Sequence, residues 1–254
     1  MAVRGTLSIL EWFGDLGIFC ARLAGALVRP PYELRELVRQ MDEVGTKSLP
    51  LVLLAGAATG VVLSLETRDT LVLFGAASQL PSLIILSVLR ETGPIITALV
   101  VCGRVGAGIG AELGAMKVTE QIDAIEASAV SPYKLLVATR VAACMLMLPL
   151  LTIVADFSAI MTGWLANRLA EPMSLSYYIT HGFLWVRFRD FLPTTGKTIV
   201  FGLLIGLIGC FQGMRTGGGT EGVGRSATTA VVIASLFVIL ADVLLVRLIM
   251  VLFG

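Results

Sequence analysis

Five long apolar runs, separated by short polar segments, dominate the pattern of hydrophobic and polar positions along the chain. They cover residues 49–65, 81–110, 141–165, 191–214 and 227–253. A helix rises about 1.5 Å per residue and the hydrocarbon core of a bilayer is about 30 Å thick, so each run has roughly the length of a membrane span. The pattern predicts an all-α integral membrane protein with five transmembrane helices in a single domain.

The N-terminal region, residues 6–47, is partly apolar but does not fit a further span. Charged residues interrupt its apolar run at Glu11, Asp15 and Arg22, and Pro30-Pro31 ends the run. The two acidic residues also argue against a secretory signal peptide, because they would fall inside its apolar segment. We interpret the run as an interfacial helix on the cytoplasmic face of the membrane, followed by a charged amphipathic helix that ends at Lys47.

Composition agrees with a membrane protein. Of the 254 residues, 56% are hydrophobic and 15% are charged, and the mean hydropathy is +0.90. A soluble domain rarely reaches this balance. The net charge of +1 does not suggest a surface for nucleic acid. The four cysteines lie in apolar segments without metal-site spacing, and the single histidine, His181, argues against a histidine-based metal site or catalytic triad.

A polar segment, residues 117–131, separates the second run from the third. Glu120, Asp123 and Glu126 recur there at a spacing of three, with Ile122 among the apolar residues between them. This spacing is typical of an amphipathic helix with one wet face. We predict a short helix in water, which either is simply solvated or seats on a partner protein.

Lysine and arginine are distributed unevenly between the two sides of the predicted membrane protein. Segments 4–47, 117–140 and 215–225 hold most of them, whereas the opposite loops hold Arg68, Arg168, Arg187 and Arg189. The positive-inside rule places the first group in the cytoplasm. With five spans, the N-terminus is then cytoplasmic and the C-terminus periplasmic.

Small residues line one face of the second run and its continuation. Ala98, Cys102, Gly106, Gly110 and Gly114 follow one another at a spacing of four, so they share one helical face. Faces of this kind allow two membrane helices to approach closely. We predict tight helix packing along this face.

Charged residues inside the predicted spans form the candidate site. They are Arg90, Glu91, Asp156, Lys197, Asp242 and Arg247. A charge at the bilayer centre costs roughly 2.5–3.5 kcal/mol on insertion scales, so each one should be paired or face a polar space. Arg247 lies near enough to the end of its span to snorkel to the surface. Glu91 and Lys197 can pair across two spans, either as a structural ion pair or as the lining of a polar cavity. Pro94 is expected to kink the helix beside them.

The stretch from Arg90 to Pro132 resembles a known family. Its segments RETGPIITAL (90–99) and GRVGAGIGAELGAMKVTEQIDAIEASAV (103–130), with Pro132, are similar to the central motif of MlaE/YrbE permeases. The resemblance extends from about Leu16 to the C-terminus. These permeases are membrane subunits of ABC transporters that act on phospholipids and other lipids together with MCE-domain proteins. The resemblance implies a homodimer in the inner membrane, with a separate cytoplasmic ABC ATPase, an MCE-domain protein and membrane lipids as partners. It implies that ATP and Mg are used by the ATPase and that this chain binds no cofactor.

The resemblance also assigns residues to two sites. Glu91, Lys197 and Asp242 match charged positions of the family, and with Arg90 we expect them to line a substrate cavity whose apolar walls include Leu83, Ile84 and Val88. The segment TEQIDAIEASAVSP matches the coupling helix, so the residues expected to meet the ATPase are Lys117, Glu120, Ile122, Asp123 and Glu126. Asp156 has no counterpart in the family pattern, and no role is assigned to it.

Other functions receive less support. Gly196-Lys197-Thr198 matches the end of a Walker A motif, but position 191 is Phe where that motif requires glycine. The glycines of segment 215–225 follow no strand, so we expect a flexible cytoplasmic hairpin there rather than a dinucleotide site. An intramembrane enzyme would need a nucleophile with a positioned base. A stand-alone secondary transporter would be supported by inverted repeats, and none is apparent.

Overall fold

The computed structural model describes residues 2–28 and 33–253, and this part of the chain is helical without any strand. The α-helices are α1 (Ala2–Val28), α2 (Leu34–Val44), α3 (Leu49–Leu73), α4 (Leu80–Ser87), α5 (Gly93–Val101), α6 (Ala107–Val118), α7 (Gln121–Ala127), α8 (Thr139–Ala170), α9 (Leu175–Gly182), α10 (Phe188–Met214) and α11 (Gly219–Phe253).

Short irregular helices join several of these elements into longer rods. Turns of 3₁₀-helix lie at η1 (Thr46–Ser48) and η2 (Ala77–Gln79), and π-helical segments lie at η3 (Val88–Thr92), η4 (Cys102–Gly106) and η5 (Tyr133–Ala138). Five rods within the described residues are long and apolar enough to cross a membrane: 34–73, 77–118, 133–170, 191–214 and 219–252. The predicted all-α membrane fold with five spans is confirmed.

The spans are longer than the apolar runs indicated. The first run was expected to end at Leu65, but α3 continues to Leu73 through several polar residues. One of these, Arg68, forms an ion pair of 2.9 Å with Glu171 just beyond α8, so the charge is held at the end of the bundle. Because helical hydrogen bonding continues beyond the hydrocarbon core, hydropathy alone marks the helix ends too early.

The predicted glycine-rich hairpin over residues 215–225 is wrong in its extent. α11 begins at Gly219, so Arg225 lies inside this helix and only a short connection separates α10 from α11. Gly218 and Gly219 turn the chain with φ angles of +85° and +73°, a region that glycine adopts without steric cost.

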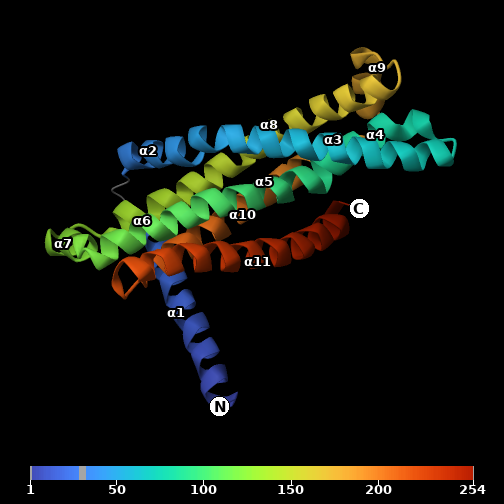
Figure 1. Ribbon diagram of the computed structural model, residues 1–254. Coiled ribbons are helices and arrows are strands. Elements are labelled where there is room, and N and C mark those ends of the chain that lie inside the picture. Colours follow the sequence, from blue (N-terminus) through green and yellow to red (C-terminus); the bar gives the residue numbers. More distant parts are fainter. Residues whose placement is uncertain (1, 29–32, 254) are drawn as a thin grey trace.

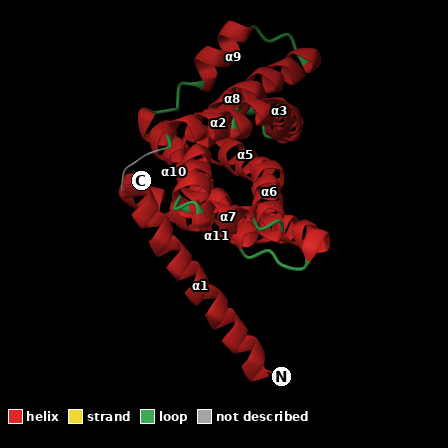
Figure 2. Cartoon of the chain, turned by 90° about the vertical axis from the view of Figure 1, so that its left-hand side faces the viewer, coloured by secondary structure: helices red, strands yellow, loops and turns green. Residues whose placement is uncertain are grey.

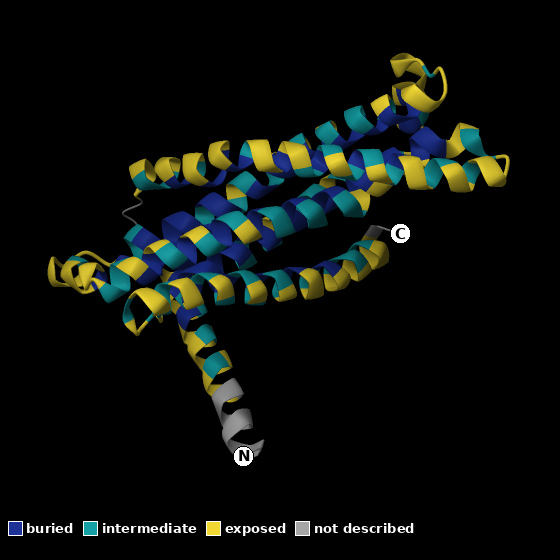
Figure 3. Cartoon of the chain, in the orientation of Figure 1, coloured by how far each residue is buried: buried dark blue, intermediate teal, exposed yellow. Residues whose placement is uncertain are grey.

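Figure 1 shows the bundle as an elongated set of rods, with α7 at one end and α9 at the other. We refer to these as the α7 end and the α9 end. α3 lies along α8, while α10 packs against α8, α6 and α11. Figure 2 shows the same arrangement from the α7 end. In Figure 3 the exposed residues lie on the outward faces of α3 and α11, where many are large and apolar. Such a surface is expected of helices that face lipid.

α1 leaves the bundle near the α7 end and points away from it (Figure 1). Its inner part is anchored by aromatic contacts of Trp12 with Phe211 and of Phe19 with Tyr133, and by an ion pair of 2.7 Å between Asp15 and Arg215. α2, in contrast, packs against α8 and continues through η1 into α3. The charged segment predicted up to Lys47 is therefore the first part of a spanning rod rather than a separate surface helix.

The predicted small-residue face is buried along its whole length. Ala98, Cys102, Gly106, Gly110 and Gly114 are all buried. A Cβ on Gly110 would lie 3.2 Å from Ala230 Cβ in α11, so this face packs closely on the neighbouring helices.

The closest helix contact, between α3 and α8, was not predicted. Gly56 and Gly60 of α3 lie against the backbone of Ala155 and Ala159 in α8. Hydroxyl groups then bridge the two backbones: Ser64 Oγ donates to Gly163 O at 3.0 Å, and Thr162 Oγ1 donates to Ala57 O at 2.9 Å. Small residues at the contact allow these bonds to form.

Gly60→Ala should destabilise the protein by about 1–3 kcal/mol, because the added Cβ would overlap the carbonyl oxygen of Ala159. The measurement is the midpoint of thermal unfolding of the purified protein in detergent. Gly17→Ala is the matched control, because a Cβ there meets nothing within 4 Å. Equal unfolding midpoints for Gly60→Ala and the unsubstituted protein would show that α3 and α8 are less tightly packed than described.

Candidate functional site

A charged cluster joins three helices inside the bundle, and we call it the Lys197 cluster. Lys197 of α10 lies with its Nζ 3.0 Å from Glu91 Oε2 of η3 and 2.9 Å from Asp242 Oδ1 of α11. Its Nζ also donates a hydrogen bond of 3.1 Å to the backbone carbonyl of Arg90. Glu91 and Lys197 were predicted to pair, because an isolated charge inside the membrane is costly. The pair is present, and Asp242 joins it.

Local sequence explains why the Arg90 carbonyl can accept this bond. Pro94, four residues later, has no N–H and cannot donate to it as a regular helix would. The preceding η3 segment is π-helical, and its bonding is displaced by one residue: the Gly93 N–H donates to Val88 O. A kink was predicted at Pro94; what the structure has directly before it is a π-helical segment, which leaves backbone oxygen open to the Lys197 ammonium.

Burial differs sharply among the members of the cluster. The side chain of Lys197 is 1% exposed and that of Asp242 12%, whereas that of Glu91 is 47% exposed. An ammonium has three N–H donors, and here three oxygens surround it. Lys197 is therefore enclosed by the protein, and Glu91 forms the open side of the cluster.

The three apolar residues predicted to line a cavity differ in burial. Ile84 and Val88 are fully buried in the protein's own core near Tyr178, so within one chain they pack the interior rather than line an open space. Leu83 is exposed on the surface of α4. The side chain of Arg90, next to the cluster in sequence, is also exposed.

Asp156 does not join the Lys197 cluster. It lies in the middle of α8, is 4% exposed, and its Oδ1 is buried without a hydrogen-bond partner. Its carboxyl faces Gly93, where any side chain would overlap it. No role was predicted for Asp156 from the sequence. In the structure it approaches the second span from α8, on the side away from Glu91.

The predicted coupling segment, residues 117–131, is not one continuous helix. Lys117 is part of α6, and Glu120 follows with a left-handed φ of +58° before the 7-residue helix α7 begins. The chain turns because this residue breaks the helical path. Lys117 Nζ forms an ion pair of 2.8 Å with Asp123 Oδ1 across the turn.

α7 has the two faces that the spacing predicted. Ile122 is buried, while Glu120, Asp123 and Glu126 are exposed. Figure 3 shows α7 as a largely exposed projection at its end of the bundle. Its exposed surface is acidic and available to a partner.

An ion pair that joins α6 to α8 and buries Arg140 was missed by sequence reasoning. Arg140 Nη2 lies 2.8 Å from Glu112 Oε1, Nη1 donates to Leu136 O at 3.0 Å, and the Arg140 side chain is only 2% exposed. The positive-inside rule had predicted that Arg140 lies at the cytoplasmic surface. The sequence hinted at burial by placing Arg140 directly before the third apolar run, which starts at Val141, but its proximity to Glu112 follows from the packing of α6 and α8.

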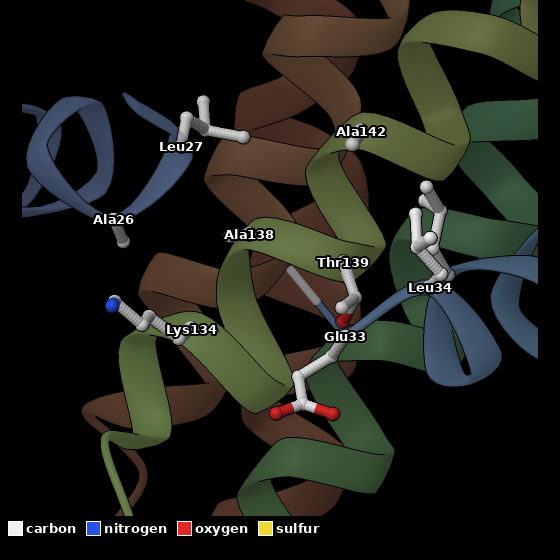
Figure 4. Close-up of a pocket in the computed structure, with 9 residues that line it drawn as sticks. Ala26, Leu27, Glu33, Leu34, Lys134, Ala138, Thr139 and Ala142 are labelled. Carbon is white, nitrogen blue, oxygen red and sulfur yellow. The ribbon is translucent and has the colours of Figure 1, made fainter. Parts of the chain in front are cut away.

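A small crevice also lies near the α7 end, between the end of α1, the start of α2 and the η5–α8 rod (Figure 4). Its lining includes Leu27, Glu33, Lys134 and Thr139, and its volume is about 70 Å³. Small-molecule sites usually have about 300–1,000 Å³. We therefore treat the crevice as a packing seam. Within the described residues, no group of three or more His, Cys, Asp or Glu side chains is arranged to hold a metal ion.

Lys197→Met should lower the free energy of unfolding by about 3–5 kcal/mol, because Asp242 would be left buried without its cation. The midpoint of unfolding in detergent is the readout. The double variant Lys197→Met/Asp242→Leu removes both buried charges and should recover much of the loss. A single variant as stable as the unsubstituted protein would contradict the enclosure of Lys197.

The chain is similar in sequence to one family model and to several known proteins. The family model described as "Permease MlaE" matches residues 37–248. A probable ABC transporter permease protein of Rickettsia felis is 34% identical over 245 residues, covering 96% of this chain and 95% of the relative. The intermembrane phospholipid transport system permease protein MlaE of Haemophilus influenzae is 33% identical, covering 93% and 92%.

A third relative, a probable ABC transporter permease protein of Synechocystis, is 34% identical over 208 residues and covers 82% of this chain and 79% of its own length. The family match includes α6, α7, η3 and the helices that carry the Lys197 cluster. Together with the five spans, these matches show that the chain belongs to the MlaE permease family and is an ABC transporter permease.

Proposed function

We propose that this chain is the membrane subunit of a transporter that moves phospholipid or a related lipid between the inner membrane and an MCE-domain partner. The energy would come from a separate cytoplasmic ATPase, which binds the ATP and Mg. The 33% identity to a phospholipid transport permease supports the lipid substrate. The structural observation that carries the proposal is the half-exposed Glu91 carboxylate of the Lys197 cluster.

An ionised carboxylate at this depth does not face hydrocarbon, because charges inside the membrane are paired or border water. Lys197 satisfies part of Glu91, yet 47% of the Glu91 side chain remains exposed. The face that carries Glu91 therefore borders a polar space. Two copies related by a two-fold axis could enclose that space, since isologous contacts are the commonest assembly. A lipid head group would lie near the cluster there, and the tails against apolar helix faces.

α7 supplies the contact expected for the ATPase. It projects from the α7 end and presents Asp123 and Glu126, with Glu120 directly before it. It is held by the buried side chain of Ile122, and the Glu112–Arg140 pair ties the preceding helix α6 to α8. A projecting element with a buried anchor can transmit force into the bundle, whereas a loosely solvated helix could not. No specific observation favours an intramembrane enzyme: the His181 ring stacks against Tyr177, with 4.1 Å between ring centroids, and the nearby Ser82 hydroxyl donates to the His181 backbone carbonyl rather than to its ring.

Orientation follows from the same proposal: the α7 end faces the cytoplasm and the α9 end faces the periplasm. In a background lacking the native cysteines, Ser176→Cys in α9 should react with a membrane-impermeant thiol reagent added to intact cells. Ser128→Cys beside α7 should react only after the cells are opened. Both positions are exposed, so accessibility within the protein is matched. Labelling of position 128 in intact cells would reverse the proposed orientation.

Reversing the charge of α7 tests the proposed function directly. Glu120→Lys with Glu126→Lys should reduce ATPase co-purification by about tenfold or more, and ATP-driven lipid transfer in proteoliposomes should fall with it, because like charges across an interface cost several kcal/mol. Glu66→Lys with Asp69→Lys is the matched control, since both acids are exposed at the opposite end of the bundle. Normal coupling and transfer in the α7 variant would refute the assignment.

A further inference from the structure

A second recess lies on the side of η3 away from the Lys197 cluster, and we call it the α8 groove. It has a volume of about 420 Å³, within the usual range for small-molecule sites. Its apolar lining comes from Leu89, Ile153, Phe157, Ile160, Phe183 and Phe191. Ile153 and Phe157 are exposed on the outer surface of α8, so the groove opens toward the surroundings of the bundle.

The α8 groove is separate from the Lys197 cluster. Leu89 lines the groove and Glu91 belongs to the cluster, and residues two apart on a helix do not share a face. The wall opposite Leu89 is α8, which contributes no residue to the cluster. A ligand in the groove would therefore contact a different set of side chains from a lipid beside Glu91.

Two ionisable residues line this otherwise apolar groove. Arg187 lies in the connection between α9 and α10, outside the membrane-length rods, and Asp156 lies deeper, on α8. Asp156 is the feature that needs an explanation, because its side chain lines the groove while its Oδ1, held against Gly93, is buried without a hydrogen-bond partner. A buried carboxyl with too few donors costs free energy, so a ligand in the groove that donates a hydrogen bond to the accessible part of this carboxyl would gain affinity.

The surrounding backbone does not satisfy Asp156. The adjacent N–H group, that of Gly93, is already bonded to Val88 O in the π-helical segment. Gly93 lacks a side chain at the point where one would overlap the Asp156 carboxyl. The chain therefore makes room for this carboxyl beside the groove without giving it a donor.

We propose that the α8 groove binds one phospholipid whose head group carries a primary amine. The ammonium donates to Asp156, the phosphate lies against Arg187, and acyl carbon covers the aromatic and aliphatic lining. The ammonium and phosphate of such a head group complement the carboxyl and the guanidinium of the groove, and a bound ammonium would favour the ionised carboxylate. The proposal concerns binding at the outer surface of one chain, so it holds whether or not the chain transports lipid.

The test uses the full-length chain in nanodiscs that contain equal amounts of phosphatidylethanolamine, phosphatidylcholine and phosphatidylglycerol. A photoreactive phenylalanine derivative replaces Phe157 in one sample and Leu146 in the control, because both residues are exposed on α8 but only Phe157 lines the groove. Mass spectrometry then identifies the cross-linked species. Phosphatidylethanolamine should be enriched at position 157, about tenfold relative to position 146, because only its head group donates N–H bonds.

Asp156→Asn should reduce this enrichment to the level of position 146, whereas Asp69→Asn, an exposed acid at the α9 end, should leave it unchanged. Arg187→Gln, in a surface connection, should also lower the enrichment of phosphatidylethanolamine at position 157. This variant tests the proposal if Asp156→Asn does not fold. Equal labelling by the three lipids, enrichment that survives both groove variants, or a polypeptide cross-linked at position 157 would each overturn the proposal. None of these readouts depends on transport, so they remain informative if the proposed function fails.

Discussion

Enclosure of the Lys197 ammonium is the constraint on which the arrangement of the spans depends. A buried charge is tolerated only when its partners are close and its hydrogen bonds are met. The partners come from η3, α10 and α11, at distances of 2.9–3.1 Å. Three membrane helices are therefore tied to one point. Glu91 can stay half-exposed because Lys197 and Asp242 already neutralise one another within the protein.

The irregular backbone of the second span also helps to satisfy the Lys197 ammonium. In a membrane, unpaired backbone groups are tolerated only where protein or water satisfies them. Pro94 and the η3 segment leave the Arg90 carbonyl available, and Lys197 supplies the missing donor. On the other side of η3, Gly93 makes room for Asp156. One short π-helical segment thus separates two polar environments, one satisfied by the protein and one in the α8 groove without a donor.

Sequence reasoning succeeded where one physical effect dominated. Hydropathy identified the five spans, because crossing hydrocarbon requires long apolar helices. The high cost of charge in the membrane brought Glu91 and Lys197 together, and the spacing of small residues identified a buried face. It failed where three-dimensional packing decides. Arg140 was assigned to water because charges near helix ends are usually solvated, and only the position of Glu112 on α6 explains its burial. The α3–α8 contact depends on which helices are neighbours, and no local pattern gives this.

The connection between α7 and the Lys197 cluster follows from how the second span is packed. α5, η4 and α6 form one rod that runs from the cluster to the turn at Glu120. The small-residue face of this rod lies against α10 and α11, the helices that carry Lys197 and Asp242. Contiguous packing of this kind transmits displacement, because close-packed helices cannot deform independently. A force applied to α7 would therefore reach α10 and α11 together with the rod. Any change it causes in the cluster must alter how the half-exposed Glu91 carboxylate is presented, since Lys197 and Asp242 are enclosed on every other side.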